Sequence, residues 1–308
     1  MQKKKEKKIH KCGFVVIVGM PNAGKSSLMN CFLKEKISIV SPKPQTTRAN
    51  VTTILSEKDY QIIFIDTPGL LKPRYKMQEV MTSLVNTAVD AADVILLIID
   101  SSEFKTEHKP EIVKLSQKFP SKKVIAALNK IDIIKKPKLL SIIEKTSGLF
   151  PGAEIFPVSA LTGESVDELL SAVLKELPEG EKLYPDDIIS TEPERFFVAE
   201  IIREAVFLKT SEELPYSSAV IIDSFQEKSP KYAIYASILV EKNSQKPIII
   251  GKNGSMIKEI GMMARSGIEE FLGQEVYLDL HVKVRKDWRN KDTYLKEIGL
   301  EKKSIKSL

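Results

Sequence analysis

The sequence has few of the residues that bind structural metals, and it has no long apolar run. Its only cysteines are Cys12 and Cys31, whose spacing matches no metal or redox motif, so we expect ordinary reduced thiols. No stretch reaches the roughly 20 apolar residues of a membrane span. No apolar signal segment follows the lysine-rich start either. We therefore expect a cytoplasmic protein.

Length and charge narrow the alternatives further. A chain of 308 residues that is 43% hydrophobic can bury two cores, so two domains are expected. The formal net charge of +6 and the pI near 9.0 suggest a polyanionic partner, although a solvated lysine-rich surface would give the same total.

The first half of the chain alternates short apolar runs with amphipathic segments of helix length. Continuous apolar runs suit parallel strands that are buried on both faces, so a doubly wound, mostly parallel α/β domain is expected over residues 13–177. A hairpin over residues 52–57 and 60–66 adds an antiparallel edge. The other predicted strands are Phe14–Gly19, Val94–Asp100, Val124–Asn129 and Ile155–Ser159.

A proline-rich and acidic stretch over residues 178–193 predicts a linker. Beyond it, residues 194–288 predict a small α+β domain. Its elements are a helix over Glu194–Lys209, strands over Ser217–Glu227 and Tyr232–Lys242, an amphipathic helix after Gly254, and a strand over Glu275–Val284. Residues 1–12 and 289–308 are expected to be basic extensions.

A phosphate-binding loop is the strongest motif. It fits the pattern GxxxxGK[ST] and lies between a predicted strand and a predicted helix, which is the context that the motif requires. Backbone N–H groups would surround the phosphates, Lys25 would neutralise their charge, and the Ser26 hydroxyl would bind Mg²⁺. The predicted loop residues are Gly19, Met20, Pro21, Asn22, Ala23, Gly24, Lys25, Ser26 and Ser27.

A second motif follows the next apolar strand. Asp66 would emerge at the strand end beside the phosphate loop and support Mg²⁺ through water, and the Gly69 N–H would sense the γ-phosphate. The predicted contact residues are Asp66, Thr67, Pro68, Gly69 and Leu70.

Base selection is predicted at two later strand ends. The Asp132 carboxylate would accept hydrogen bonds from N1–H and the 2-amino group of guanine, two donors that adenine lacks, which favours GTP over ATP. Lys130 would lie along the base and brace the phosphate loop. The predicted residues are Asn129, Lys130, Ile131 and Asp132, with Ser159, Ala160 and Leu161 offering a backbone N–H to guanine O6.

Residues 41–48 are predicted to form a switch loop. Thr47 would complete the Mg²⁺ coordination while the γ-phosphate is present, and hydrolysis would release the loop. We expect Lys25, Thr47 and Gly69 to act in catalysis.

These motifs, in this order, resemble the translation-factor-like GTPases. Gln45-Thr46-Thr47-Arg48 and Asp66-Thr67-Pro68-Gly69 narrow the resemblance to the Era family. Segments of the second half, among them Glu200-Ile201-Ile202-Arg203-Glu204 and Leu214-Pro215-Tyr216-Ser217, resemble the C-terminal half of Era. The resemblance covers residues 11–299.

The resemblance bears on hydrolysis. Leu70 stands where many small GTPases carry a water-positioning glutamine, so another group must position water. Asn22 resembles the asparagine that binds K⁺ in potassium-dependent relatives, which implies K⁺ stimulation with Thr46 and the carbonyls of Ser41 and Lys43 completing the site. Asn22 could instead be an ordinary loop residue. Intrinsic turnover should be slow, and Arg48 is only a weak candidate for the γ-phosphate.

The second half carries the GxxG pattern of a KH domain, whose loop clamps about four nucleotides of single-stranded RNA. The element order suggests the type II arrangement. Trp288 is expected to be a packing anchor, and the basic C-terminal stretch either contacts phosphates or is simply solvated. The predicted RNA contacts are Ile249, Gly251, Lys252, Asn253, Gly254, Ile257, Lys283 and Arg285.

The hypothesis is a slow GTPase that uses GTP/GDP and Mg²⁺. By resemblance it binds the 3′ end of 16S rRNA and acts in small ribosomal subunit assembly, with peripheral membrane association possible and a monomer expected. One alternative is an RNA-binding adaptor with GTP as a structural ligand. Another, a GTPase of tRNA modification, is disfavoured because no cysteine follows Cys31. A tandem GTPase would need a second GKS motif, which is absent.

Overall fold

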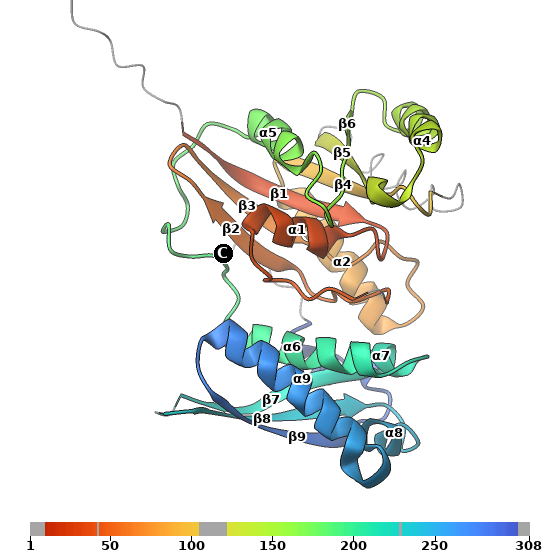
Figure 1. The fold of residues 1–308 in the computed structure, drawn as a ribbon, viewed down its shortest axis with the longest axis vertical. Helices are drawn as coiled ribbons and strands as arrows, with labels where there is room; N and C mark the ends of the chain where they lie inside the picture. The colour runs from red at the N-terminus through yellow and green to blue at the C-terminus, as the bar shows by residue number, and fades with distance from the viewer. Residues whose placement is uncertain (1–9, 42, 105–121, 228–229, 301–308) are drawn as a thin grey trace, which may run out of the picture.

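The computed structural model describes residues 10–41, 43–104, 122–227 and 230–300. Two layered units lie one above the other, with the N-terminal unit at the top of Figure 1. Most of the predicted N-terminal extension and the last part of the predicted C-terminal one lie outside the described residues. Among the helices of the described part, none has the length and apolar character that crossing a membrane would require.

The first unit is built on a six-stranded sheet with the order β2-β3-β1-β4-β5-β6. Strands β2 and β3 pair antiparallel, as the predicted hairpin requires, and the remaining pairs are parallel. The strands are β1 (Lys11–Gly19), β2 (Val51–Ser56), β3 (Tyr60–Asp66), β4 (Val94–Asp100), β5 (Lys123–Asn129) and β6 (Glu154–Pro157). Strand β6 ends before Ser159, so its predicted end was two residues too late.

Helices cover both faces of this sheet, which explains the continuous apolar strands. One buried cluster joins the sheet to α1 (Lys25–Leu33) and α5 (Val166–Glu176). Another joins it to α2 (Lys76–Ala91) and α4 (Lys136–Leu149). Because neither face is free, alternating polar residues would leave unpaired groups in the core.

The second unit has a three-stranded sheet with the order β7-β8-β9. Strand β8 pairs antiparallel with β7 and parallel with β9. Helices α6 and α9 pack on the sheet through one buried cluster. The elements are α6 (Glu194–Lys209), α7 (Leu214–Ser217), β7 (Ser218–Gln226), β8 (Tyr232–Val240), α8 (Lys246–Ile250), α9 (Ser255–Leu272), β9 (Val276–Val284) and α10 (Asp292–Glu297). This order confirms the type II KH arrangement.

The segment predicted as a linker runs along the edge of the first sheet. The Ile54 N–H donates to Ile189 O at 2.7 Å, and the Ser190 hydroxyl donates to Thr52 O at 2.6 Å. The buried Gln61 amide donates to Tyr184 O at 2.8 Å. These bonds hold the connection against β2 and β3, so it is an ordered strap.

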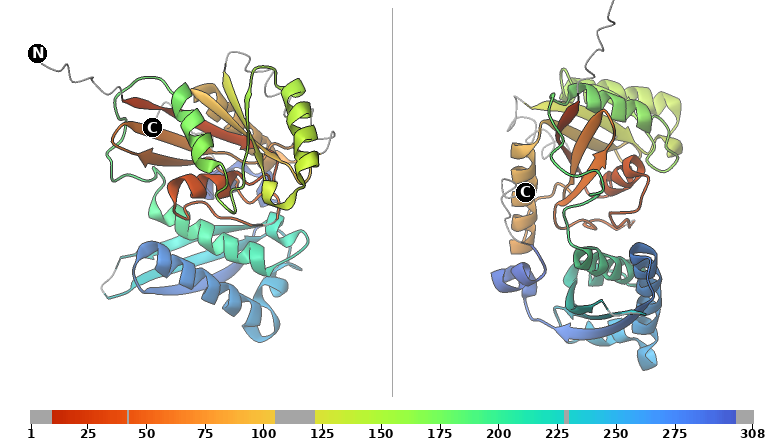
Figure 2. Two further views of the ribbon diagram at one scale, coloured as in Figure 1. Left: turned by 45° about the horizontal axis from the view of Figure 1, so that its top comes forward. Right: turned by 90° about the vertical axis from the view of Figure 1, so that its left-hand side faces the viewer.

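The two units share a buried apolar cluster. Met77, Met81 and Leu84 from α2 pack with residues of the second unit, including Trp288 and Leu295. Figure 2 shows α2 extending toward the segment that follows β9. The Trp288 side chain is fully buried, and its indole N–H donates to Ser217 O at 3.0 Å. The expectation that Trp288 is a packing anchor is confirmed.

Candidate functional site

The carboxyl ends of β1, β3, β4 and β5 meet at one edge of the first sheet, and a cavity of about 460 Å³ lies there. Parallel strands gather the residues that follow them at a common edge, where ligands bind in open α/β sheets. The residues lining this cavity come from the phosphate loop and the switch segment, and they also include Ile39, Val40, Gly69, Asp100, Glu103 and Lys130. The phosphate loop and Lys130, which the sequence separates by over a hundred residues, thus line one cavity.

The phosphate loop leads from β1 into α1. Gly24 has φ of +91°, and a Cβ at this position would lie 2.1 Å from the Asn129 amide nitrogen, so only glycine fits. Lys25 is buried and donates to Gly19 O at 3.3 Å and to Met20 O at 3.1 Å. Burial lowers the pKa of Lys25 to about 8, an effect that the charge of Asp66 offsets only in part.

The predicted magnesium ligands lie together. Ser26 Oγ donates to Asp66 Oδ2 at 2.6 Å, and Thr47 Oγ1 lies 3.0 Å from Ser26 Oγ. Asp66 is fully buried, and its Oδ1 has no hydrogen-bond partner among the described residues. Burial raises its pKa to about 6, while Lys25 and the Ser26 hydroxyl oppose the shift. An all-oxygen set with an orphaned carboxylate oxygen fits Mg²⁺.

The segment after β3 is held against the phosphate loop. The Thr67 hydroxyl donates to Ile17 O at 2.7 Å, and the Leu70 N–H donates to Gly19 O at 3.0 Å. The Leu70 side chain packs against the core cluster on the α2 side of the sheet. Leu70 therefore offers no polar group that could position water, as the sequence analysis predicts.

The Asn129 side chain connects two loops of the site. Its amide nitrogen donates to Ala23 O at 2.9 Å, and its amide oxygen accepts from the Ala160 N–H at 2.9 Å. Bracing of the phosphate loop, which was predicted for Lys130, thus comes from Asn129. The Asp132 carboxylate is exposed and accepts from Ser159 Oγ at 2.5 Å, which brings the two guanine motifs together.

Lys130 pairs instead with a residue that the sequence analysis did not select. Its ammonium lies 2.6 Å from Asp100 Oδ2. Burial opposes ionisation of Asp100, but the hydrogen bonds from Lys130 and Ser102 outweigh it, so the pKa of Asp100 is lowered. The signal for Asp100 was its position at the carboxyl end of β4, the same position that Asp66 and Asn129 hold on their strands.

The switch segment brings Thr46 and Thr47 to the cavity but turns Arg48 away. The Arg48 guanidinium is buried between the two units and donates to Ser218 O at 2.6 Å and to Pro215 O at 2.8 Å. The weak candidacy of Arg48 for the γ-phosphate was wrong in this conformation, because Nη1 and Nη2 both donate to carbonyls of the second unit.

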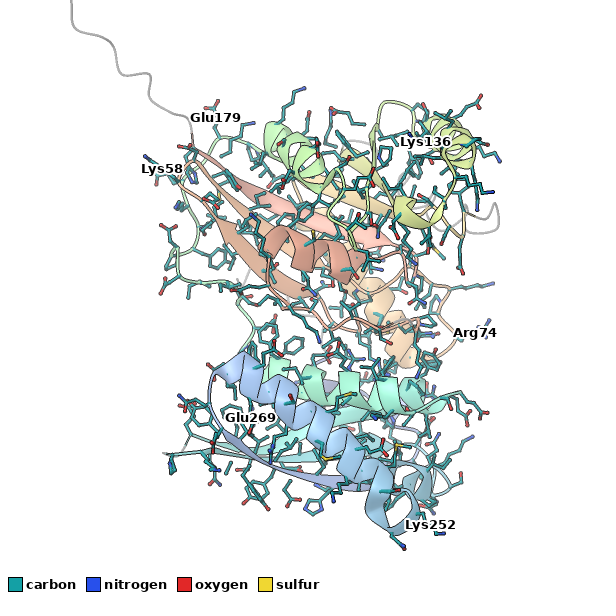
Figure 3. The ribbon with its side chains drawn as sticks, in the orientation of Figure 1. Lys58, Arg74, Lys136, Glu179, Lys252 and Glu269 are labelled. Carbon is teal, nitrogen blue, oxygen red and sulfur yellow. The ribbon has the colours of Figure 1, made fainter. Side chains whose placement is uncertain are left out.

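The GxxG loop lies at the far end of the second unit, where Lys252 points outward (Figure 3). Lys252 and Asn253 are exposed. Gly251 has φ of +74°, and a Cβ there would lie 2.6 Å from the Met256 nitrogen. The loop thus approaches the start of α9 more closely than any other residue type allows.

A groove beside α9 contains one of the two predicted apolar contacts. Ile257 lines a cavity of about 690 Å³ with residues of α9 and β9 such as Met262 and Leu280. The prediction that Ile249 contacts RNA was wrong, because Ile249 lies in the short helix α8 and is fully buried in the core. On β9, Lys283 lies 3.1 Å from Asp223.

Comparisons with known proteins agree with both units. Residues 14–130 match the family described as 50S ribosome-binding GTPase, and residues 213–289 match the KH domain family. GTPase Era of Clostridium botulinum is 45% identical over 95% of this chain and 99% of its own length. GTPase Era of Trichlorobacter lovleyi is 44% identical, with coverage of 95% and 98%.

Two solved structures are similar over nearly the whole chain. One is Era in complex with MgGDPNP and nucleotides 1506–1542 of 16S ribosomal RNA, with a TM-score of 0.90, 41% identity and coverage of 94% and 99%. The other is an Aquifex aeolicus Era variant bound to GDP and AlF₄⁻, with a TM-score of 0.89, 41% identity and the same coverage.

The fold and the site define a P-loop GTPase joined to a KH domain. Similarity to curated relatives extends over both units and the strap between them. The chain belongs to the Era family of GTPases.

The position of Asp132 predicts the base preference. Asp132→Asn should weaken GTP binding by on the order of 10²–10³-fold, because two hydrogen bonds to a charged acceptor are lost. It should improve XTP binding, since an amide can donate to the 2-oxo group of xanthine. Competition binding of the two nucleotides measures both. Glu164→Gln, at a nearby exposed residue, is the control, and unchanged GTP affinity in Asp132→Asn would contradict the assignment.

Burial of Asp66 predicts a pH dependence of stability without nucleotide and metal. Its pKa is raised from 3.8 to about 6, so ionising it costs more in the folded state, and the wild type loses stability as pH rises across this window. Asp66→Asn lacks this cost. Its free energy of unfolding relative to wild type should therefore rise from pH 4 to pH 6 and then level off.

Urea denaturation across that pH range measures the difference. Asp187→Asn, at an exposed residue of the strap, is the control and should show no such trend. A pH-independent difference for Asp66→Asn would contradict the assigned cause.

Proposed function

We propose that this GTPase binds the single-stranded 3′ end of 16S rRNA through its KH domain and acts in small ribosomal subunit assembly. The observation that carries the proposal is the likeness, at a TM-score of 0.90 and 41% identity, to the Era chain solved with MgGDPNP and a 16S rRNA segment. The exposed GxxG loop supports the proposal, as does the groove beside α9, which apolar residues such as Ile257 line together with Lys258 and Arg265, because a KH domain clamps RNA at its GxxG loop.

We assign the residues of the nucleotide site as follows. Lys25 and the backbone N–H groups of the phosphate loop hold the phosphates. Ser26 and Thr47 hold Mg²⁺ directly, and Asp66 holds it through water. The Gly69 N–H contacts the γ-phosphate, and Asp132 reads the guanine edge. Bound Mg²⁺ neutralises charge that develops on the phosphate oxygens.

None of the residues assigned above is a glutamine that could orient the attacking water. Leu70 is apolar and partly buried, so a backbone group or another side chain must take that role. Asn22, with φ of +63°, lines the cavity. We propose that it binds K⁺ with Thr46, which lines the same cavity, and with the carbonyls of Ser41 and Lys43, so that a cation supplies the charge that an arginine finger supplies elsewhere.

The K⁺ proposal predicts a dependence on the monovalent cation. Single-turnover hydrolysis should be at least about tenfold faster in KCl than in NaCl, a small part of the roughly 10³–10⁵ that an arginine finger contributes. Asn22→Gly should abolish this advantage while keeping GDP affinity, because glycine accepts the positive φ. Equal rates of the wild type in both salts would contradict the proposal.

The RNA proposal predicts the effect of reversing charge on the GxxG loop. Lys252→Asp with Asn253→Asp should lower affinity for the 16S rRNA 3′ tail by at least about tenfold, through lost phosphate contact and new repulsion. Fluorescence anisotropy with the GTP-analogue complex, at fixed salt, measures the affinity.

A matched control changes the same charge at the other end of the KH unit. Lys231→Asp with Gln274→Asp alters two residues near the start of β8 and β9, away from the loop, and should bind as the wild type does. Equal, weak binding by all three proteins would leave a GTPase with another partner. Equal loss in both double variants would indicate non-specific electrostatics.

The proposal also covers organisation and location. We propose domain limits near 13–177, 178–193 and 194–288, with the first domain starting at Lys11, where β1 begins, and the second extended to α10, whose Leu295 is buried. We also propose a cytoplasmic monomer with peripheral membrane association. Sedimentation analysis measures the oligomeric state, and flotation with anionic and neutral vesicles measures membrane attachment.

A further inference from the structure

The switch segment is held by the KH unit as well as by its own unit. Helix α6 faces the first unit (Figure 1). From this helix Glu204 accepts from the Val40 N–H at 3.1 Å and from the Lys36 ammonium at 2.8 Å. Lys43 donates to the carbonyls of Phe207 and Thr210 at the end of the same helix. The loop that closes over the nucleotide cavity thus lies on α6.

The closest connection to the site is made by Arg203 of α6. Its side chain is only 4% exposed, and Nη2 donates to the carbonyl of Thr46. Nε donates to Glu200 Oε1 at 2.7 Å, and Nη2 also reaches the other carboxylate oxygen. The guanidinium centre lies 5.1 Å from the centroid of the Phe207 ring. Carboxylate, ring and carbonyl together fix its orientation.

Arg48 makes the reciprocal connection. From the switch it extends into the KH unit, donates to two carbonyls there, and lies 5.6 Å from the centroid of the same Phe207 ring. Two guanidinium groups are thus buried beside one ring, and Arg48 Nε and Arg203 Nη1 have no hydrogen-bond partner among the described residues. Because each buried group depends on the hydrogen bonds that it does make, displacement of either residue would leave further donors unpaired.

These two contacts flank Thr47. The Thr46 carbonyl is held by Arg203, and the side chain of Arg48 is held by the KH unit. Planar peptide bonds join Thr47 to Thr46 on one side and to Arg48 on the other. With both neighbours held, the backbone dihedral angles of Thr47 have little freedom. Its hydroxyl lies 3.0 Å from Ser26 Oγ, at the proposed magnesium position.

We propose that Arg203 is a positioning residue for GTP hydrolysis: from the KH unit it holds the Thr46 carbonyl so that the Thr47 hydroxyl meets Mg²⁺ when the γ-phosphate is present. This inference rests on the magnesium role proposed above for Thr47. It is independent of RNA. Because GDP does not require Thr47, loss of Arg203 should affect the triphosphate state selectively.

The test uses full-length protein without RNA. Arg203→Met should raise the Mg²⁺ concentration for half-maximal single-turnover hydrolysis by about tenfold and weaken binding of a non-hydrolysable GTP analogue by about tenfold, the equivalent of one charge-assisted hydrogen bond. Affinity for fluorescent GDP should stay within about twofold. Arg195→Met, at an exposed position of the same helix, should match the wild type throughout.

Two further variants separate the possible failures. Thr47→Ala should reproduce the Arg203→Met pattern more strongly; if it does not, the proposed role of Thr47 fails. If Thr47→Ala behaves as expected while Arg203→Met leaves Mg²⁺ dependence unchanged, or weakens GDP and GTP-analogue binding equally, the inference about Arg203 is overturned.

Folding of the variants is checked by thermal unfolding. If Arg203→Met does not fold, Glu200→Gln takes its place, because that carboxylate orients the guanidinium and its side chain is 21% exposed. It should shift the Mg²⁺ dependence in the same direction by about threefold, the equivalent of a weakened hydrogen bond. An unchanged Mg²⁺ dependence there overturns the inference as well.

Discussion

The side chain of Asn129 joins the phosphate loop to the guanine loop through one donated and one accepted hydrogen bond. Its amide lies so close to Gly24 that no side chain fits at that position. The bond to Ala23 is buried and the bond from Ala160 is partly buried. Leaving a buried polar group unpaired costs about 1–3 kcal/mol. The parallel sheet delivers the strand ends to one edge, but this amide sets the distance between the two halves of the nucleotide site.

The second constraint is the sharing of the switch between the two units. Val40 and Thr46 line the cavity, and their backbone groups also hydrogen-bond to residues of α6. Buried arginines are suited to such a contact, because their hydrogen bonds depend strongly on geometry. Displacement of Arg48 or Arg203 would therefore break several hydrogen bonds at once.

Much of this fold could be predicted from the sequence because its patterns are local. The run over Val94–Asp100 and the helix over Glu194–Lys209 have the predicted bounds, since an unbroken apolar run and a regular amphipathic pattern leave few alternatives. Residues 247–250 are too few to show a helical or strand-like spacing of hydrophobic residues. The helix α8 and the burial of Ile249 were therefore not predicted.

The partners of Lys130 and Arg48 were not predicted for a different reason. The pairing of Lys130 with Asp100 and the direction of Arg48 both depend on elements that are distant in the chain. A motif fixes which residue type is present, but charge pairing depends on what the fold places beside it. The strand-end rule would have drawn attention to Asp100, whereas no local signal distinguishes an arginine that turns toward a neighbouring domain.

Energetic cost is concentrated where the ligand binds. Burial lowers the pKa of Lys25 to about 8 and raises that of Asp66 to about 6, so each group is held in surroundings that disfavour its charge. The Lys25 ammonium donates hydrogen bonds to carbonyls of its own loop. One carboxylate oxygen of Asp66 has no hydrogen-bond partner among the described residues. Lys25 and Asp66 offset each other's burial only in part, and phosphate and Mg²⁺ would supply further opposite charge to each. Burying these two charges costs free energy in the protein without ligand, and bound phosphate and Mg²⁺ would reduce that cost. Such perturbed groups are common at functional sites.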